Sequence, residues 1–158
     1  MKALVVYYSR TGNTKKAGEE IARTLKADSE EIIDRKNRKG MLSYLSSGRS
    51  AQKKEPTEIG PLQKDPAKYD MVIIGTPNWA SNISCAARTY ISQNKDKLKH
   101  AKQIAFFCTA GGGSNGHIFA DMEELCGKSP KATLELATKE VSNGEHLQKV
   151  QDFAKRLS

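Results

Sequence analysis

The chain is poor in the residues that hold together disulfide-rich or metal-dependent small domains. Its 158 residues include only three cysteines, Cys85, Cys108 and Cys126, an odd number without a C-x-x-C spacing. The three histidines show no ligand spacing with the cysteines or with one another. This pattern argues against both a disulfide framework and a zinc site, so we expect no bound metal.

Long apolar runs are missing as well. No apolar stretch approaches the ~20 residues that a membrane-spanning helix needs. Met1 and Lys2 lead directly into a strand pattern instead of a signal peptide. We therefore expect a cytoplasmic protein without membrane association. The length and the 37% hydrophobic content predict a single globular domain over residues 1–158.

Acidic residues are scarce relative to basic ones, but only in one part of the chain. The chain has 26 Lys and Arg against 18 Asp and Glu, a net charge of +8. Residues 35–68 hold nine basic and three acidic side chains, whereas residues 1–34 and 69–127 are each neutral. This segment is also rich in Pro, Gly and Ser, and its pattern predicts a short helix over residues 40–47 that ends at Gly48. We interpret residues 35–68 as a basic, helix-bearing insertion.

Strand and helix patterns alternate along the rest of the chain. Apolar runs at residues 3–8, 71–74 and 104–108 predict strands buried on both faces, and mixed runs at 30–34 and 133–137 predict edge strands. Apolar stripes predict helices over about 17–25, 83–91, 118–125 and 147–157, the last starting at a capping box from Ser142 to Glu145. The fold class is therefore α/β, a three-layer sandwich with five parallel strands in the order 2-1-3-4-5.

Three unusual loops follow the central strands, where ligands bind in such sheets. They read Ser9-Arg10-Thr11-Gly12-Asn13-Thr14, Gly75-Thr76-Pro77-Asn78-Trp79-Ala80 and Thr109-Ala110-Gly111-Gly112-Gly113. The first has the hydroxyls, the glycine and the helix N-terminus typical of a phosphate site. The second holds the only tryptophan, a flat face for stacking, and the third offers unblocked backbone N–H groups. Alone, each loop could be an ordinary turn, a core lid or a surface loop; together at one edge, they indicate a ligand site.

These three motifs, in this order, resemble the FMN-binding loops of the flavodoxin family. The resemblance covers essentially the whole chain and implies a flavodoxin-like fold with FMN as the cofactor. It implies that the phosphate is held by Ser9, Thr11, Gly12, Asn13 and Thr14, with Arg10 contributing mostly its backbone. It further implies that the ring lies between the Trp79 loop and the Gly111 loop, and that backbone groups near Asn78 and at Ala110, Gly111 and Gly112 meet the ring edge. No side chain is required as a catalytic acid or base.

The chain departs from the electron-carrier flavodoxins in two ways. Those proteins are acidic, and they usually place a second aromatic residue in the third loop, where this chain has Ala110 and glycines. An uncovered flavin face suits a stacked substrate or nicotinamide, as in quinone reductases of the same fold. Two flavin functions stay open: electron transfer by one- or two-electron cycling of FMN, with a redox partner protein or a small acceptor, and NAD(P)H-dependent quinone reduction.

Two other classes of function fit the sequence less well. A non-catalytic protein could bind an acidic partner through the basic segment, but no aromatic residues interleave there as single-stranded nucleic acid binding favours, so no nucleic acid is expected. A phosphatase would need a nucleophile beside the first loop, and residues 1–27 contain neither Cys nor Asp. The oligomeric state stays open.

Overall fold

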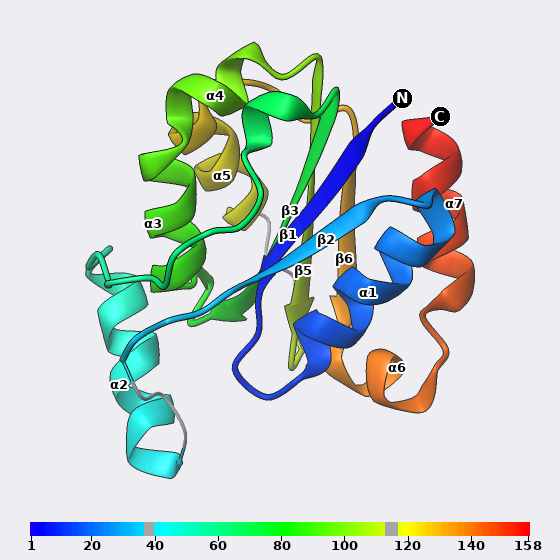
Figure 1. Ribbon diagram of the computed structural model, residues 1–158. Coiled ribbons are helices and arrows are strands. Elements are labelled where there is room, and N and C mark those ends of the chain that lie inside the picture. The colour runs from blue at the N-terminus through cyan, green and yellow to red at the C-terminus, as the bar shows by residue number, and fades with distance from the viewer. Residues whose placement is uncertain (37–39, 113–116) are drawn as a thin grey trace.

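A parallel sheet forms the middle layer of the molecule (Figure 1). The computed structural model describes residues 1–36, 40–112 and 117–158. The parallel strands are β1 (Ala3–Tyr8), β2 (Asp28–Ile32), β3 (Met71–Trp79), β5 (Gln103–Ala110) and β6 (Thr133–Ala137). Their order is β2-β1-β3-β5-β6, which confirms the predicted arrangement.

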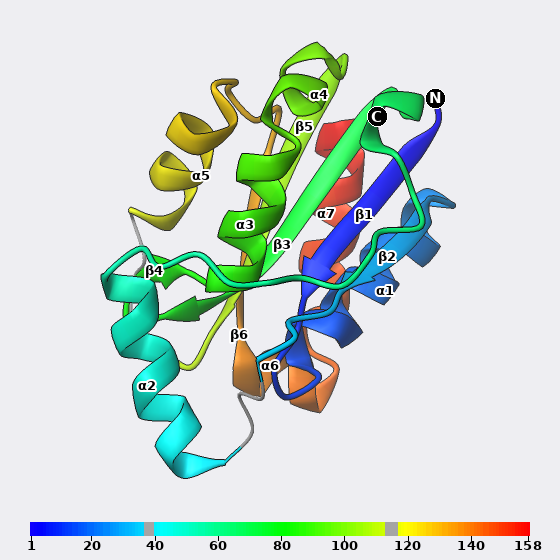
Figure 2. The same cartoon turned by 60° about the vertical axis from the view of Figure 1, so that its left-hand side comes forward.

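Helices cover both faces of this sheet (Figures 1 and 2). One face carries α1 (Asn13–Leu25), α6 (Thr138–Asn143) and α7 (Leu147–Leu157), and the other carries α3 (Cys85–Gln93), α4 (Lys95–His100) and α5 (Ile118–Cys126). Side chains of β1 alternate between the two cores: Val5 and Tyr7 pack on the α1 side, Leu4 and Val6 on the α3 side. All six residues of β1 are buried for this reason. Within the described residues, no helix is long and apolar enough to cross a membrane.

Two expected helix starts are wrong. Ile83 belongs to β4 (Asn82–Ile83), a short strand that pairs antiparallel with the end of β3, and α3 begins only after Ser84. The predicted capping box at Ser142 does not begin α7, because Ser142 lies inside α6 and its hydroxyl donates to the Thr138 carbonyl at 2.9 Å. The left-handed Gly144, with φ 78°, ends α6 instead.

The helix of the basic segment is longer than expected. α2 (Met41–Gln52) continues through Gly48 and lies beside β4, at the carboxyl end of the strands (Figure 2). Gly48 faces the loop after β3: a Cβ on Gly48 would stand 3.8 Å from the Cβ of Ala80, an ordinary van der Waals distance.

The rest of the basic segment returns along the edge of the sheet. The Gly60 amide donates to the Ile33 carbonyl at 2.7 Å, and the Lys64 amide donates to the Glu30 carboxylate at 3.1 Å. The chain then enters β3 through the short 3₁₀ helix η1 (Pro66–Lys68). This return covers β2, which would otherwise be an open sheet edge.

Candidate functional site

The first loop forms a tight turn between β1 and α1. Gly12 adopts φ 100°, a left-handed conformation that disfavours a side chain, and its amide donates to the Ser9 hydroxyl at 3.1 Å. Ser9, Arg10, Thr11 and Gly12 line a cavity of about 570 Å³ together with Glu31 and Gly40. α1 begins at Asn13, directly after Gly12, and the N-terminus of a helix favours an anion.

A second cavity, of about 220 Å³, brings the three loops together. It is lined by Arg10, Thr11, Asn13, Thr14, Pro77, Asn78, Trp79, Thr109, Gly111 and Thr138. Arg10 and Thr11 line both cavities, so the two adjoin. The second cavity holds both the first residues of α1, Asn13 and Thr14, and Trp79.

Buried hydroxyls hold the loops in place. The hydroxyls of Thr14 and Thr109 lie 2.7 Å apart and join the start of α1 to the end of β5. In the second loop, the Thr76 hydroxyl accepts the Ser84 amide at 3.1 Å, and Ser84 in turn caps α3. Trp79 meets the Tyr8 ring edge to face, with the centroids 5.5 Å apart.

Asn78 carries a polar atom that suits a ligand with an N–H group. Its Oδ1 is buried and has no hydrogen-bond partner in the described part of the chain, although Asn78 lines the second cavity. A buried acceptor without a donor is costly. A Cβ on Gly111, which also lines this cavity, would meet no described atom within 4 Å, so the described residues leave open space beside the third loop. A flat heterocycle with a polar edge and a phosphate tail, as in FMN, fits this set of groups.

The structure gathers most of the predicted site residues at these two cavities. Four lie elsewhere: Thr76 is fully buried beneath the second loop, Ala80 faces α2, Ala110 is buried in β5, and Gly112 is exposed beside the lining. Gly113 lies outside the described residues.

Sequence reasoning missed three lining residues. Glu31 and Gly40 line the first cavity and Thr138 lines the second. Thr138 directly follows β6, so the rule that pointed to the loops after the central strands would also have indicated it.

Comparison with known proteins identifies the family. Residues 1–125 match the NADPH-dependent FMN reductase family. The chain belongs to this family. It is a flavodoxin-like FMN protein with a redox function. No curated protein matches the chain significantly.

Solved structures share the fold of this FMN reductase family member. A flavoprotein from Lactobacillus acidophilus NCFM, solved in complex with FMN, is 21% identical with a TM-score of 0.71, covering 90% of this chain and 97% of the other. The two-electron reduced flavodoxin of Megasphaera elsdenii is 16% identical with a TM-score of 0.62, covering 96% and 97%. The oxidised flavodoxin 2 of Bacillus cereus is 19% identical with a TM-score of 0.55, covering 99% and 97%.

The charged and nucleophilic groups near the site supply no acid–base pair. Among the described residues that line the two cavities, Arg10 is the only cation and Glu31 the only acid. Lys15 pairs with Glu31 at 2.7 Å, and this hydrogen bond raises the pKa of Lys15. Burial raises the pKa of the Cys108 thiol to about 12, so it is no nucleophile near neutral pH. An FMN reductase family member needs none, because the cofactor carries the redox chemistry.

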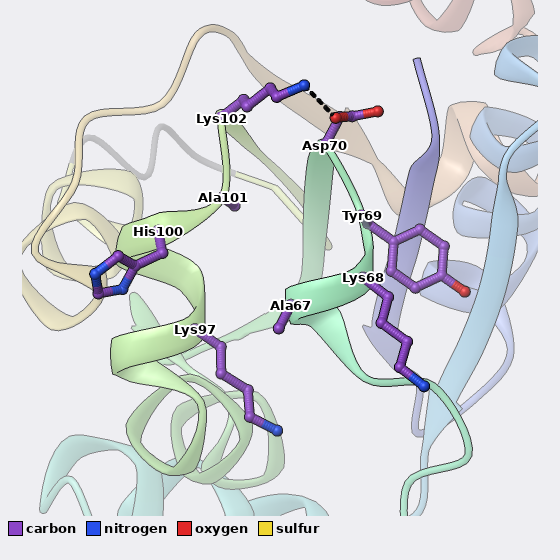
Figure 3. Close-up of a pocket in the computed structure, with 8 residues that line it drawn as sticks. All are labelled: Ala67, Lys68, Tyr69, Asp70, Lys97, His100, Ala101 and Lys102. Atoms are coloured by element: carbon purple, nitrogen blue, oxygen red, sulfur yellow. Dashed lines mark ion pairs between the residues drawn. The ribbon is translucent and has the colours of Figure 1, made fainter.

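Another cavity, of about 280 Å³, lies at the opposite end of the sheet, before β3 and β5 (Figure 3). Its cations are largely paired: Lys102 contacts Asp70 at 2.7 Å and Lys97 contacts Asp65 at 2.9 Å. In Figure 3, the side chains of Lys68 and Lys97 extend in similar directions, and the His100 ring points away from both. This cavity therefore lacks the convergent polar groups of the site at the carboxyl end.

Proposed function

We propose that the two adjoining cavities form the FMN site. In this proposal, the first loop and the N-terminus of α1 bind the phosphate, and the ring lies between Trp79 and Gly111. Bound FMN supplies electron transfer in one- or two-electron steps. The chain's own contribution is to bind and orient it: the Asn78 Oδ1 accepts from the polar edge of the ring, and the Thr14–Thr109 contact keeps the first and third loops at their spacing.

We further propose that the protein takes its electrons directly from NAD(P)H. The observation that carries this step is the third loop, which has no aromatic residue from Thr109 to Gly116, while Trp79 stands on the other side of the cavity. A ring covered on one side only leaves space for a nicotinamide to stack. The family, described as NADPH-dependent, supports the same function.

A second function, as a carrier between partner proteins, is supported by the fold shared with the flavodoxins of Megasphaera elsdenii and Bacillus cereus. Anaerobic mixing of the FMN-loaded protein with NADPH or NADH separates the two functions. Prompt bleaching of the flavin band by a pyridine nucleotide alone is the expected result. Bleaching that occurs only after a flavoprotein reductase is added would replace this proposal with the carrier function.

The position of the ring is tested by two neighbouring glycines. Gly111 lines the cavity and Gly112 does not, and a Cβ on either would meet no described atom within 4 Å. Gly111→Ala is expected to raise the Kd for FMN by about tenfold, because a methyl group would enter space that the ring needs. Gly112→Ala is the matched control and should bind FMN like the parent. Emission of FMN and of the single tryptophan reports the binding. Equal affinities of the two variants would place the ring elsewhere.

A further inference from the structure

A separate cavity of about 460 Å³ lies between α2 and the end of β3. It is lined by Leu45, Gly48, Arg49, Gln52, Trp79 and Ala80. Trp79, which is 6% exposed, also lines the cavity between the three loops. Figure 2 shows α2 standing at the same end of the sheet as the carboxyl ends of the strands.

The packing of α2 directs specific side chains to this cavity. The helix buries only small residues among its described side chains, namely Ser47, Ser50 and Ala51. With Gly48 against Ala80, these small residues bring the helix close to the loop. Leu45, which is 66% exposed, and Arg49 therefore lie at a cavity wall instead of being buried in the core.

The lining combines a flat apolar surface with one cation. The exposed Leu45 side chain, with the small exposed part of Trp79, offers apolar contact area for an aromatic ring. Arg49 is exposed, and no described residue forms an ion pair or a side-chain hydrogen bond with its guanidinium. A guanidinium in this position suits a carboxylate, sulfonate or phosphate in bidentate geometry. Lys53 and Lys54 follow at the end of α2 and add positive potential.

We propose that this cavity binds a small planar aromatic anion, with its ring against Trp79 and Leu45 and its acidic group on Arg49 and Gln52. The proposal deepens the proposed function and rests on it, because Trp79 lines both this cavity and the proposed FMN site. It assigns to residues 35–68 the binding of a negatively charged aromatic molecule beside the proposed flavin site. A volume of about 460 Å³ is in the range of small-molecule sites.

Redox-inert probes test the binding without turnover. Calorimetry on the oxidised, FMN-loaded protein compares naphthalene-2-sulfonate with 2-naphthol, which has the same ring system but is neutral. The sulfonate is expected to bind more tightly than 2-naphthol. Arg49→Gln is expected to raise the Kd of the sulfonate by about tenfold and to change the Kd of 2-naphthol by less than twofold. Lys53→Gln is the matched control, because it removes the same charge from the end of α2 without touching the lining. It should change both affinities less than twofold.

Three outcomes would overturn the proposal. The parent protein does not bind the sulfonate, the Arg49 and Lys53 variants lose equal affinity for the sulfonate, or Arg49→Gln loses equal affinity for both probes. Competition with NADP⁺ identifies the source of the anion. Displacement of the sulfonate would indicate that the site binds a dinucleotide, and a lack of displacement would indicate a free aromatic acid. Both results support an aromatic anion site. FMN affinity is measured in parallel and should not change in Arg49→Gln. A parent protein that takes up no FMN would refute the flavin site, whereas sulfonate binding measured on that same protein still tests this cavity.

Discussion

At the scale of single residues, the pairing of Gly75 with Phe107 shows how a glycine makes room for an aromatic ring in the core beneath the sheet. The two residues are opposite each other on β3 and β5, and a Cβ on Gly75 would overlap the Phe107 ring. We expect Gly75→Ala to lower the free energy of unfolding by about 1–3 kcal/mol, because the ring must leave its rotamer or the strands must separate. Urea unfolding of the protein measures the change. Gly112→Ala, with open space around it, should stay within about 0.5 kcal/mol, and a similar loss in both variants would contradict the overlap.

A second prediction concerns Tyr7 and the stability of the folded protein at alkaline pH. Burial first, and the carboxylates of Glu19 and Glu31 next, raise its pKa from 10.0 to about 12. The folded protein therefore holds this proton more tightly than the unfolded chain does. The resulting stability is complete below pH 10 and is lost as the pH rises towards 12. Tyr7→Phe keeps the ring and should show a smaller loss of unfolding free energy across this range. Parallel pH curves for parent and variant would show that Tyr7 contributes nothing.

At the scale of elements, the contact between Thr14 and Thr109 ties the first helix to the third loop. The two buried hydroxyls, 2.7 Å apart, each depend on the other for a partner. Replacing either with Val leaves the remaining hydroxyl unpaired, and we expect each single variant to lose about 1–2 kcal/mol of apoprotein stability. The double variant should lose less than the sum of the two, which a double-mutant cycle by urea unfolding measures. Strictly additive losses would mean that the two hydroxyls act independently.

The elements also show which parts of the fold could be predicted from sequence patterns. The buried strands and the sheet order were predictable, because long apolar runs have few alternatives to a strand covered on both faces. The start of α3 was not, since Ile83 fits a helical stripe and only its pairing with Asn78 makes it a strand. The continuation of α2 through Gly48 to Gln52 was not predictable either, because a glycine after an apolar stripe is a common helix end. The loops of the candidate site were predictable from residue types, whereas the cavity beneath α2 was not.

At the scale of the whole molecule, the net charge of +8 affects which redox partners approach the flavin. Within the insertion, Arg35 pairs with Glu58, but Arg49 has no ion-pair partner among the described residues, and it lies beside Trp79. Opposite charges attract at distances up to about a Debye length, about 8 Å at 0.15 M ionic strength, so salt should slow the encounter with an anion.

This effect can be measured after photoreduction of the bound flavin under anaerobic conditions. Reoxidation by the ferricyanide trianion should slow as the ionic strength rises, and reoxidation by the hexaammineruthenium(III) trication should become faster, because the same positive field attracts one and repels the other. Combining Arg49→Gln, Lys53→Gln and Lys54→Gln removes three positive charges from the end of α2 and should flatten both dependences. If the positive field lies far from the flavin, the triple variant will keep the salt dependence of the parent protein, and the insertion then has no part in attracting acceptors.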